Sequence, residues 1–69
     1  MTVTKVVELL GESDRSWDHA VEVAVREAAK TVHNITGVRV LNMTGTVEDG
    51  RIVEYKANVQ IAFAVDGTD

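Results

Sequence analysis

The hydrophobic residues of this chain follow two spacings, one that repeats every three or four positions and one that alternates. The helical spacing runs over residues 16–34, where apolar positions share one side and charged positions recur on another. The apolar positions are Trp17, Val21, Ala24, Ala28, Val32 and Ile35, and the charged ones are Asp18, Glu22, Arg26 and Lys30. The pattern predicts one amphipathic helix over residues 16–34, with Ser16 as its N-cap.

The apolar side of this helix consists mostly of alanine and valine, so it is thin. A thin stripe favours close packing on a β-sheet over packing in a helical bundle, and we expect the closest approach at Ala28. Val21, Val23 and Val25 are β-branched, which lowers the intrinsic stability of the helix. Contacts with the rest of the chain must therefore hold the helix in place.

Alternating patterns predict strands over residues 3–10, 38–47 and 51–65. The last is the longest, and one of its faces carries Val53, Tyr55, Ala57, Val59, Ile61, Phe63 and Val65. Glu48, Asp49 and Gly50 predict a tight turn between the last two strands, with Gly50 at positive φ. We expect residues 66–69 to be loose.

The order of elements predicts an α+β fold of β-α-β-β type, with a single domain over residues 1–69. A strand of about 15 residues extends roughly 50 Å at ~3.3 Å per residue. The helix covers only about 25 Å of that length at ~1.5 Å per residue. Much of the third strand must therefore curl around the helix or contact another subunit.

Size and composition also favour self-association. The hydrophobic core of a 69-residue chain supplies little net stability, and this chain has no cysteine for disulfides or thiolate zinc sites. The formal net charge is −4 and the basic residues are scattered, which argues against nucleic acid as a partner. No signal peptide and no long apolar run is present, so a cytoplasmic protein that does not enter membranes is expected.

Four segments of the sequence, together with the distances between them, resemble those of the dodecins, small flavin-binding proteins that assemble as hollow homododecamers. They are KVVELLGES leading into SWDHAV, AAKTVHNI at the helix end, the EDG turn, and EYKANVQIAF in the last strand. The resemblance implies a three-stranded antiparallel sheet partly wrapped around one helix, with ligands between subunits. It implies storage or sequestration of flavin (riboflavin or FMN) or a related small ligand, and no enzymatic activity.

The resemblance also implies a cofactor-binding pocket that includes Thr36, Gly37, Val38 and Lys56. In flavin-binding dodecins a Trp stacks on the flavin ring and a Gln contacts its polar edge. Gly37 stands at the position of that Trp, and Lys56 at the position of that Gln. Trp17, in the first turn of the helix, cannot replace the Trp, and we assign it to core packing. The pocket therefore departs from the family pattern at both flavin-contacting positions.

The alternative is a flavin-free dodecin with a structural or calcium-binding role. Glu48, Asp49 and Glu54 could supply the oxygen ligands that calcium prefers, although carboxylates at a hairpin are usually solvated turn residues. His19 and His33 lie near the helix ends without a metal-ligand spacing. No nucleophile–base pair, paired carboxylates or Gly-rich phosphate loop is apparent, so we do not expect an enzyme.

Overall fold

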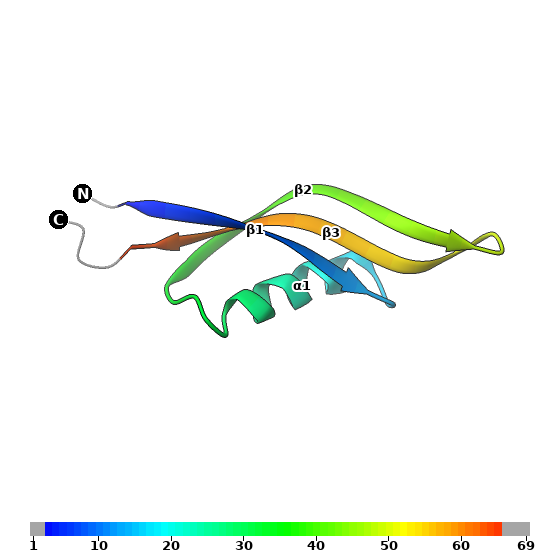
Figure 1. Ribbon diagram of the computed structural model, residues 1–69, viewed down its shortest axis with the longest axis horizontal. Helices are drawn as coiled ribbons and strands as arrows, with labels where there is room; N and C mark the ends of the chain where they lie inside the picture. The colour runs from blue at the N-terminus through cyan, green and yellow to red at the C-terminus, as the bar shows by residue number, and fades with distance from the viewer. Residues whose placement is uncertain (1–2, 66–69) are drawn as a thin grey trace.

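The computed structural model describes residues 3–65 and has the predicted β-α-β-β order (Figure 1). Its elements are β1 (Thr4–Ser13), α1 (Trp17–Ala28), β2 (Ile35–Glu48) and β3 (Arg51–Ala64). The three strands form one antiparallel sheet in the order β1-β3-β2, so the last strand of the chain is central. The α+β class is thereby confirmed, whereas residues 66–69 lie outside the described part.

Two strands are longer than their local patterns predicted. β1 continues through Gly11 to Ser13, and β2 begins at Ile35 instead of residue 38. In both cases the added residues pair with β3, which runs the full length of the sheet. Pairing with a long central strand therefore extends the edge strands beyond the residues that favour them locally.

The helix begins where expected but ends early. The Ser16 side chain accepts the backbone N–H of His19 at 3.0 Å, which confirms the N-cap. The last helical residue is Ala28, and the N–H groups of Thr31 and Val32 both bond to the Ala28 carbonyl in a closing turn. Asn34 then takes a positive φ of 62°, which redirects the chain into β2. The predicted helix over residues 16–34 was therefore too long, because its last third forms this reversal.

The core lies between α1 and the middle of β3. Its buried residues come from one side of each element: Ala20, Ala24, Ala28, Ala57, Val59 and Ile61. The predicted face of β3 is confirmed, but the centre of the helix face lies along Ala20, Ala24 and Ala28, and Ala20 was missed. We call the face of the sheet that α1 packs against the inner face, and the opposite one the outer face.

Helix and sheet come into very close contact at Gly11 of β1, not at Ala28. A Cβ atom at Gly11 would collide with the backbone carbonyl oxygen of Ala20 and would lie 3.0 Å from the Cβ of Ala24. Glycine is therefore needed at this position for steric reasons. The small residues of the helix do permit close packing, as predicted, but the atoms next to Gly11 belong to Ala20 and Ala24, about two turns and one turn before Ala28.

The β2–β3 hairpin turns at Asp49 and Gly50, with φ of 51° and 75° respectively. Two consecutive positive φ values are the signature of a type I′ turn, which fits an Asp-Gly pair. The predicted turn is therefore confirmed. β2 departs from regular pairing at three positions, between Ile35 and Gly37, between Val40 and Asn42, and between Thr46 and Val47.

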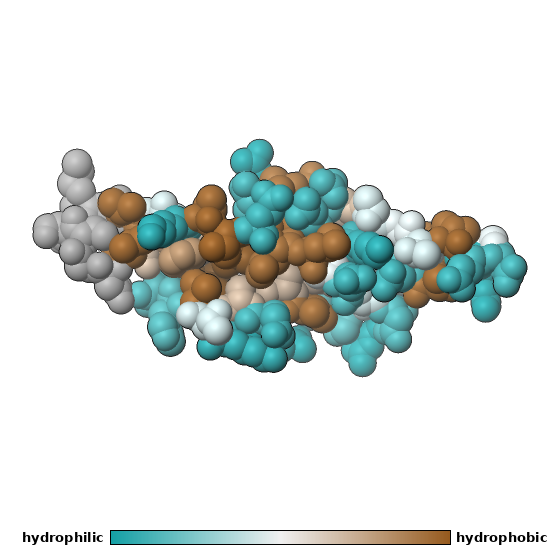
Figure 2. All heavy atoms as spheres, viewed as in Figure 1, coloured by the Kyte–Doolittle hydropathy of each residue, from teal (hydrophilic) through white to brown (hydrophobic). Residues whose placement is uncertain are grey.

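The molecule is long and only partly covered by its helix. It extends 54 × 20 × 13 Å, and β2 and β3 continue together past the N-terminal end of α1 to the hairpin (Figure 1). All of β2 except Ile35 and Thr46 is exposed. Figure 2 shows hydrophobic side chains in a band along the long axis of this view. Among the described residues, no helix is long and apolar enough to cross a bilayer.

Candidate functional site

Gly37 lies in a row of small and apolar residues on the outer face. Its partner on β3 is Ala62, and Ala62 pairs in turn with Val6 of β1. Ala62 alternates with the buried Ile61, so these directly paired residues share the face that α1 leaves open. Val6 is 57% exposed. We call Gly37, Ala62 and Val6 the open floor.

A side chain at Gly37 would project into free space. A Cβ built there meets no atom within 4 Å, and Gly50 is the glycine with a positive φ in the described part. Gly37 therefore has backbone geometry that any residue can adopt. In this chain the open floor offers a ligand no aromatic surface, only backbone and small side chains.

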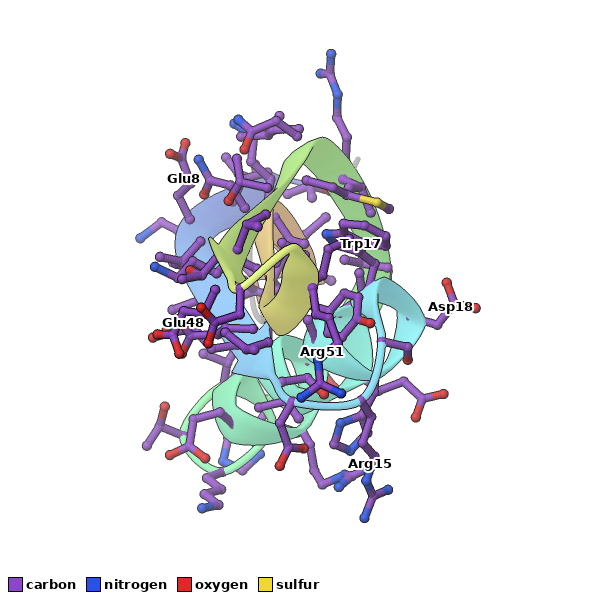
Figure 3. All side chains as sticks on the ribbon, turned by 90° about the vertical axis from the view of Figure 1, so that its right-hand side faces the viewer. Glu8, Arg15, Trp17, Asp18, Glu48 and Arg51 are labelled. Carbon is purple, nitrogen blue, oxygen red and sulfur yellow. The ribbon has the colours of Figure 1, made fainter. Side chains whose placement is uncertain are left out.

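The next row on the same face is polar and charged. Arg39 of β2 pairs with Gln60 of β3, and Gln60 pairs with Glu8 of β1. Glu8 points away from α1 in Figure 3. We name Arg39, Gln60 and Glu8 the polar row. Sequence analysis did not select it, although Arg39 could have been found from strand alternation, since it lies two positions after Gly37.

The two neighbours of Gly37 lie in different environments. Thr36 falls at the first irregularity of β2, and its hydroxyl donates to the Ala62 carbonyl at 3.4 Å. Val38 pairs with the buried Ile61 and so lies on the inner face. It lines a shallow apolar cleft of about 400 Å³ with Val21 and Val25 of the helix. Gly37 is therefore part of the open floor and Thr36 lies next to it, whereas Val38 lies on the opposite face of the sheet.

Lys56 shares the outer face with Gly37 but lies far from it within one protomer. It lies six positions from Ala62 along β3, which corresponds to roughly 20 Å. Its ammonium group lies 3.5 Å from a Glu54 carboxylate oxygen, and its partner on β1 is Glu12. One protomer therefore does not bring Gly37 and Lys56 to a common small ligand; a second copy would have to supply one of the two.

The three hairpin carboxylates do not form a metal site within one protomer. In the described residues, no group of three or more His, Cys, Asp or Glu side chains is placed to hold a metal ion. The Glu54 carboxylate already has two other contacts, since it pairs with the Lys56 ammonium group and accepts a hydrogen bond from the Thr46 hydroxyl at 3.3 Å. Glu48 and Asp49 lie at the hairpin turn, and the ring of oxygens that calcium prefers is not assembled there.

Trp17 connects the start of α1 to the β2–β3 ribbon. Its indole N–H donates to the Thr44 carbonyl at 2.8 Å, and its ring packs edge-on against Tyr55 with centroids 4.8 Å apart. In Figure 3 it reaches towards the sheet, whereas Asp18 points away. The structure thus agrees with a packing role for Trp17, and the ring is not free to stack on a ligand.

The two histidines have separate surroundings. The Ser13 hydroxyl and His19 Nδ1 are 2.6 Å apart, and the same hydroxyl accepts the backbone N–H of Arg15 at 2.9 Å. This arrangement fastens the β1–α1 connection. His33 lines a shallow cleft of about 360 Å³ together with Lys5 and Phe63. Neither histidine belongs to a described group that could hold a metal.

Comparison with known proteins extends these observations. The structure superposes on the tt0972 protein from Thermus thermophilus with a TM-score of 0.93 at 28% identity, covering 99% of this chain and 100% of that one. A sequence model of the family described as Dodecin matches residues 3–66. The chain belongs to the dodecin family. The resemblance inferred from four short segments is thereby confirmed, as is the dodecin-like fold.

Two relatives carry informative names. The protein named Dodecin from Thermus thermophilus is 29% identical to this dodecin over 66 residues, which is 96% of each chain. The protein named Calcium dodecin from Mycobacterium tuberculosis is 30% identical over 63 residues, 91% of this chain and 89% of that one. A crystal structure of the latter, described as having a novel calcium-binding site, superposes with a TM-score of 0.79 at 29% identity, covering 97% of this chain and 96% of that one.

Proposed function

We propose that this dodecin is a non-enzymatic, self-assembling binding protein that stores or sequesters flavin, or a related planar ligand, between its subunits. The observation that carries the proposal is the open floor beside the polar row. It is a surface of small and apolar residues that α1 leaves uncovered, and the second predicted contact, Lys56, lies too far away to act within the same chain. The proposed site therefore requires at least two copies.

The amount of uncovered surface supports self-association. The chain exposes 4915 Å², whereas a compact monomer of 7.5 kDa exposes about 4,250 Å². Ten large apolar residues of the described part are exposed. Among them, those on the inner face of β2 pair with core residues of β3 and are nevertheless 39–48% exposed: Val38, Val40 and Met43. Twelve copies, as in the family, would cover surfaces of this kind.

Flavin titration of the parent and of a restored pocket tests the proposal. The parent is expected to bind riboflavin or FMN weakly, because no side chain at Gly37 can stack on the ring. The double variant Gly37→Trp, Lys56→Gln returns both family contacts, and a stacked aromatic adds about 0.5–1.5 kcal/mol beyond burial. The open space around Gly37 and its ordinary φ support tolerance of the Trp.

The readout is quenching of flavin fluorescence, with assembly of both proteins checked by sizing chromatography. Tighter binding by the double variant than by the parent is the expected result. Tight binding by the parent would contradict the argument from Gly37 while leaving a flavin function in place. Absence of binding to both assembled proteins would remove flavin from the proposed function.

Calcium binding is the second candidate, favoured by the name of the Mycobacterium tuberculosis relative. Within the described residues of one protomer the necessary oxygens do not gather, so such a site would have to combine carboxylates from neighbouring copies. Calorimetric titration with Ca²⁺ on the assembled protein tests this candidate. Binding that disappears in the variant Glu48→Gln, Asp49→Asn would assign it to the hairpin; absence of heat would exclude it.

A further inference from the structure

The open floor has a polar side and an apolar side along the direction of the strands. On one side it adjoins the polar row, in which Arg39, Gln60 and Glu8 lie next to one another across the sheet. On the other side the next pair on the outer face is Thr4 and Ala64, which carries neither a charge nor an amide. A planar ligand with one polar edge would therefore lie on the open floor with that edge towards the polar row.

Gln60 stands on the central strand directly beside the open floor. Gln60 and Ala62 are two positions apart on β3 and share the outer face, so their Cα atoms are about 7 Å apart. In an extended rotamer the amide carbon of Gln60 is two carbons farther from the sheet than the Ala62 methyl group. A ring in van der Waals contact with that methyl group, at about 3.5–4 Å, would lie close to the height of the amide. The Gln60 amide therefore faces the edge of such a ring.

The amide of Gln60 is available to a ligand and differs in kind from its neighbours. None of the side-chain hydrogen bonds within residues 3–65 involves Gln60. A carboxamide both donates and accepts hydrogen bonds, whereas the Arg39 guanidinium only donates and the Glu8 carboxylate only accepts. Within the polar row, Gln60 is thus the residue that can satisfy a donor and an acceptor lying side by side on a ligand.

A cyclic imide is an edge that matches this arrangement. It presents an N–H group between two carbonyl oxygens, as the pyrimidine end of the flavin ring does. The Gln60 amide can accept the N–H and donate to an adjacent carbonyl, and Arg39 supplies a further donor on the neighbouring strand. Lys56 has no acceptor and lies roughly 20 Å from Ala62 within the protomer.

We infer that Gln60 selects planar ligands that have an imide edge, and that it acts from the same protomer as the open floor beneath the ring. This inference rests on the proposed flavin function and names the ligand class of that same site. The contact is distinct from the one that the resemblance predicted at Lys56. A methyl group on the imide nitrogen would remove the donor and leave the Gln60 carbonyl unpaired, so the site should reject such a ligand.

The test compares lumiflavin with 3-methyllumiflavin on the assembled protein by quenching of flavin fluorescence. Both compounds are flavin rings without a ribityl chain or phosphate, and they differ only at the imide nitrogen. We expect the parent to bind lumiflavin about three- to tenfold more tightly, the range for one neutral hydrogen bond. Gln60→Met keeps the length of the side chain and removes the amide, so it should bring the ratio close to one. Gln60→Leu takes its place if sizing chromatography shows that Gln60→Met does not assemble.

A matched control is Asn58→Leu, which removes another carboxamide on the same strand and the same face, one row farther from Gly37. It should leave the ratio unchanged. A ratio near one in the parent, a ratio that survives loss of the Gln60 amide, or a ratio that disappears in Asn58→Leu would overturn the inference while leaving flavin binding intact.

Titration of the parent with riboflavin separates failure of the inference from failure of the proposed function. If riboflavin binds the assembled parent and lumiflavin does not, the ligand is recognised through its side chain, and the inference about the ring edge is overturned. If neither compound binds the assembled parent, the proposed flavin function fails and the inference fails with it.

Discussion

The two edge strands of the sheet differ in how much of their inner face the protomer covers. β1 packs so closely on α1 that Gly11 leaves no room for a side chain beside the Ala20 carbonyl. β2 has almost no cover, and Val38 and Met43 are 45% and 48% exposed although their partners on β3 are buried. The comparison indicates that one half of the molecule is stabilised within the chain. The other half lacks such cover within the chain, and on the proposal of self-assembly a neighbouring copy covers it.

The largest effect is expected for a glycine-to-alanine substitution at Gly11 of β1, compared with the same substitution at Gly37 of β2. Gly11→Ala places a methyl group against backbone, which cannot move without shifting α1, and should cost about 3 kcal/mol or more of unfolding free energy. Gly37→Ala meets nothing and should change stability by no more than about 0.5 kcal/mol. Urea denaturation at equal protomer concentration checks both, since assembly affects apparent stability. Similar costs would mean that the two edges do not differ.

A charge on the bare inner face of β2 should act mainly on assembly. Met43→Asp introduces a carboxylate where we expect contact with a second copy, and burying an unpaired charge costs several kcal/mol. Sizing chromatography should show a shift from the large particle to small species. Arg26→Gln, which changes net charge by the same amount on an exposed side of α1, should leave the particle intact. An unchanged particle in Met43→Asp would place the interface elsewhere.

A smaller effect is expected from overpacking the helix. Ala28 is buried and Lys30 is exposed. Ala28→Leu should cost about 1–3 kcal/mol, and Lys30→Leu no more than about 0.5 kcal/mol. The effect at Ala28 should stay below that of Gly11→Ala, because Ala28 adjoins a shallow cleft with Val7 and Leu9 where a longer side chain can partly fit. Equal melting temperatures for the two leucine variants would mean that the helix faces are misassigned.

The smallest effect is expected at Trp17, which connects the start of α1 to the β2–β3 ribbon. Trp17→Phe keeps an aromatic ring against Tyr55 but removes the indole N–H that bonds to the Thr44 carbonyl. The loss of one hydrogen bond at an exposed site should cost about 0.5–1.5 kcal/mol. Trp17→Ala removes both contacts and should cost more. A Phe variant as unstable as the Ala variant would assign the whole contribution of Trp17 to its hydrogen bond.

Sequence patterns correctly predicted the buried face of β3, whose residues alternate between the two faces of the sheet, and the position of the hairpin. The alternation of β3 identified Ala57, Val59 and Ile61 as its buried face, and Asp49 with Gly50 identified the hairpin. The end of the helix was missed because Val32 continues the helical spacing after the backbone has turned at Ala28. Local spacing does not report where a chain must reverse to reach its next strand.

The candidate site was less accessible to sequence reasoning. The irregularity at Thr36 determines which face each early β2 residue occupies, and it can be located only from the pairing of β2 with β3. Val38, which lies on the inner face, was included in the predicted pocket as the sequence neighbour of Gly37, and Arg39, two positions after Gly37, was overlooked. Family resemblance supplied the position of Gly37, but the distance between Gly37 and Lys56 required the register of the sheet.

The most direct test of the contrast between the two edge strands is the mass of the native particle, measured by native mass spectrometry at low concentration. If the bare half of the sheet is completed by neighbouring copies, the dominant species should have about twelve times the 7.5 kDa mass of the chain. Some of these particles should also carry added flavin. A folded species of 7.5 kDa that persists without assembly would contradict the account, because the exposed side of β2 would then need no partner.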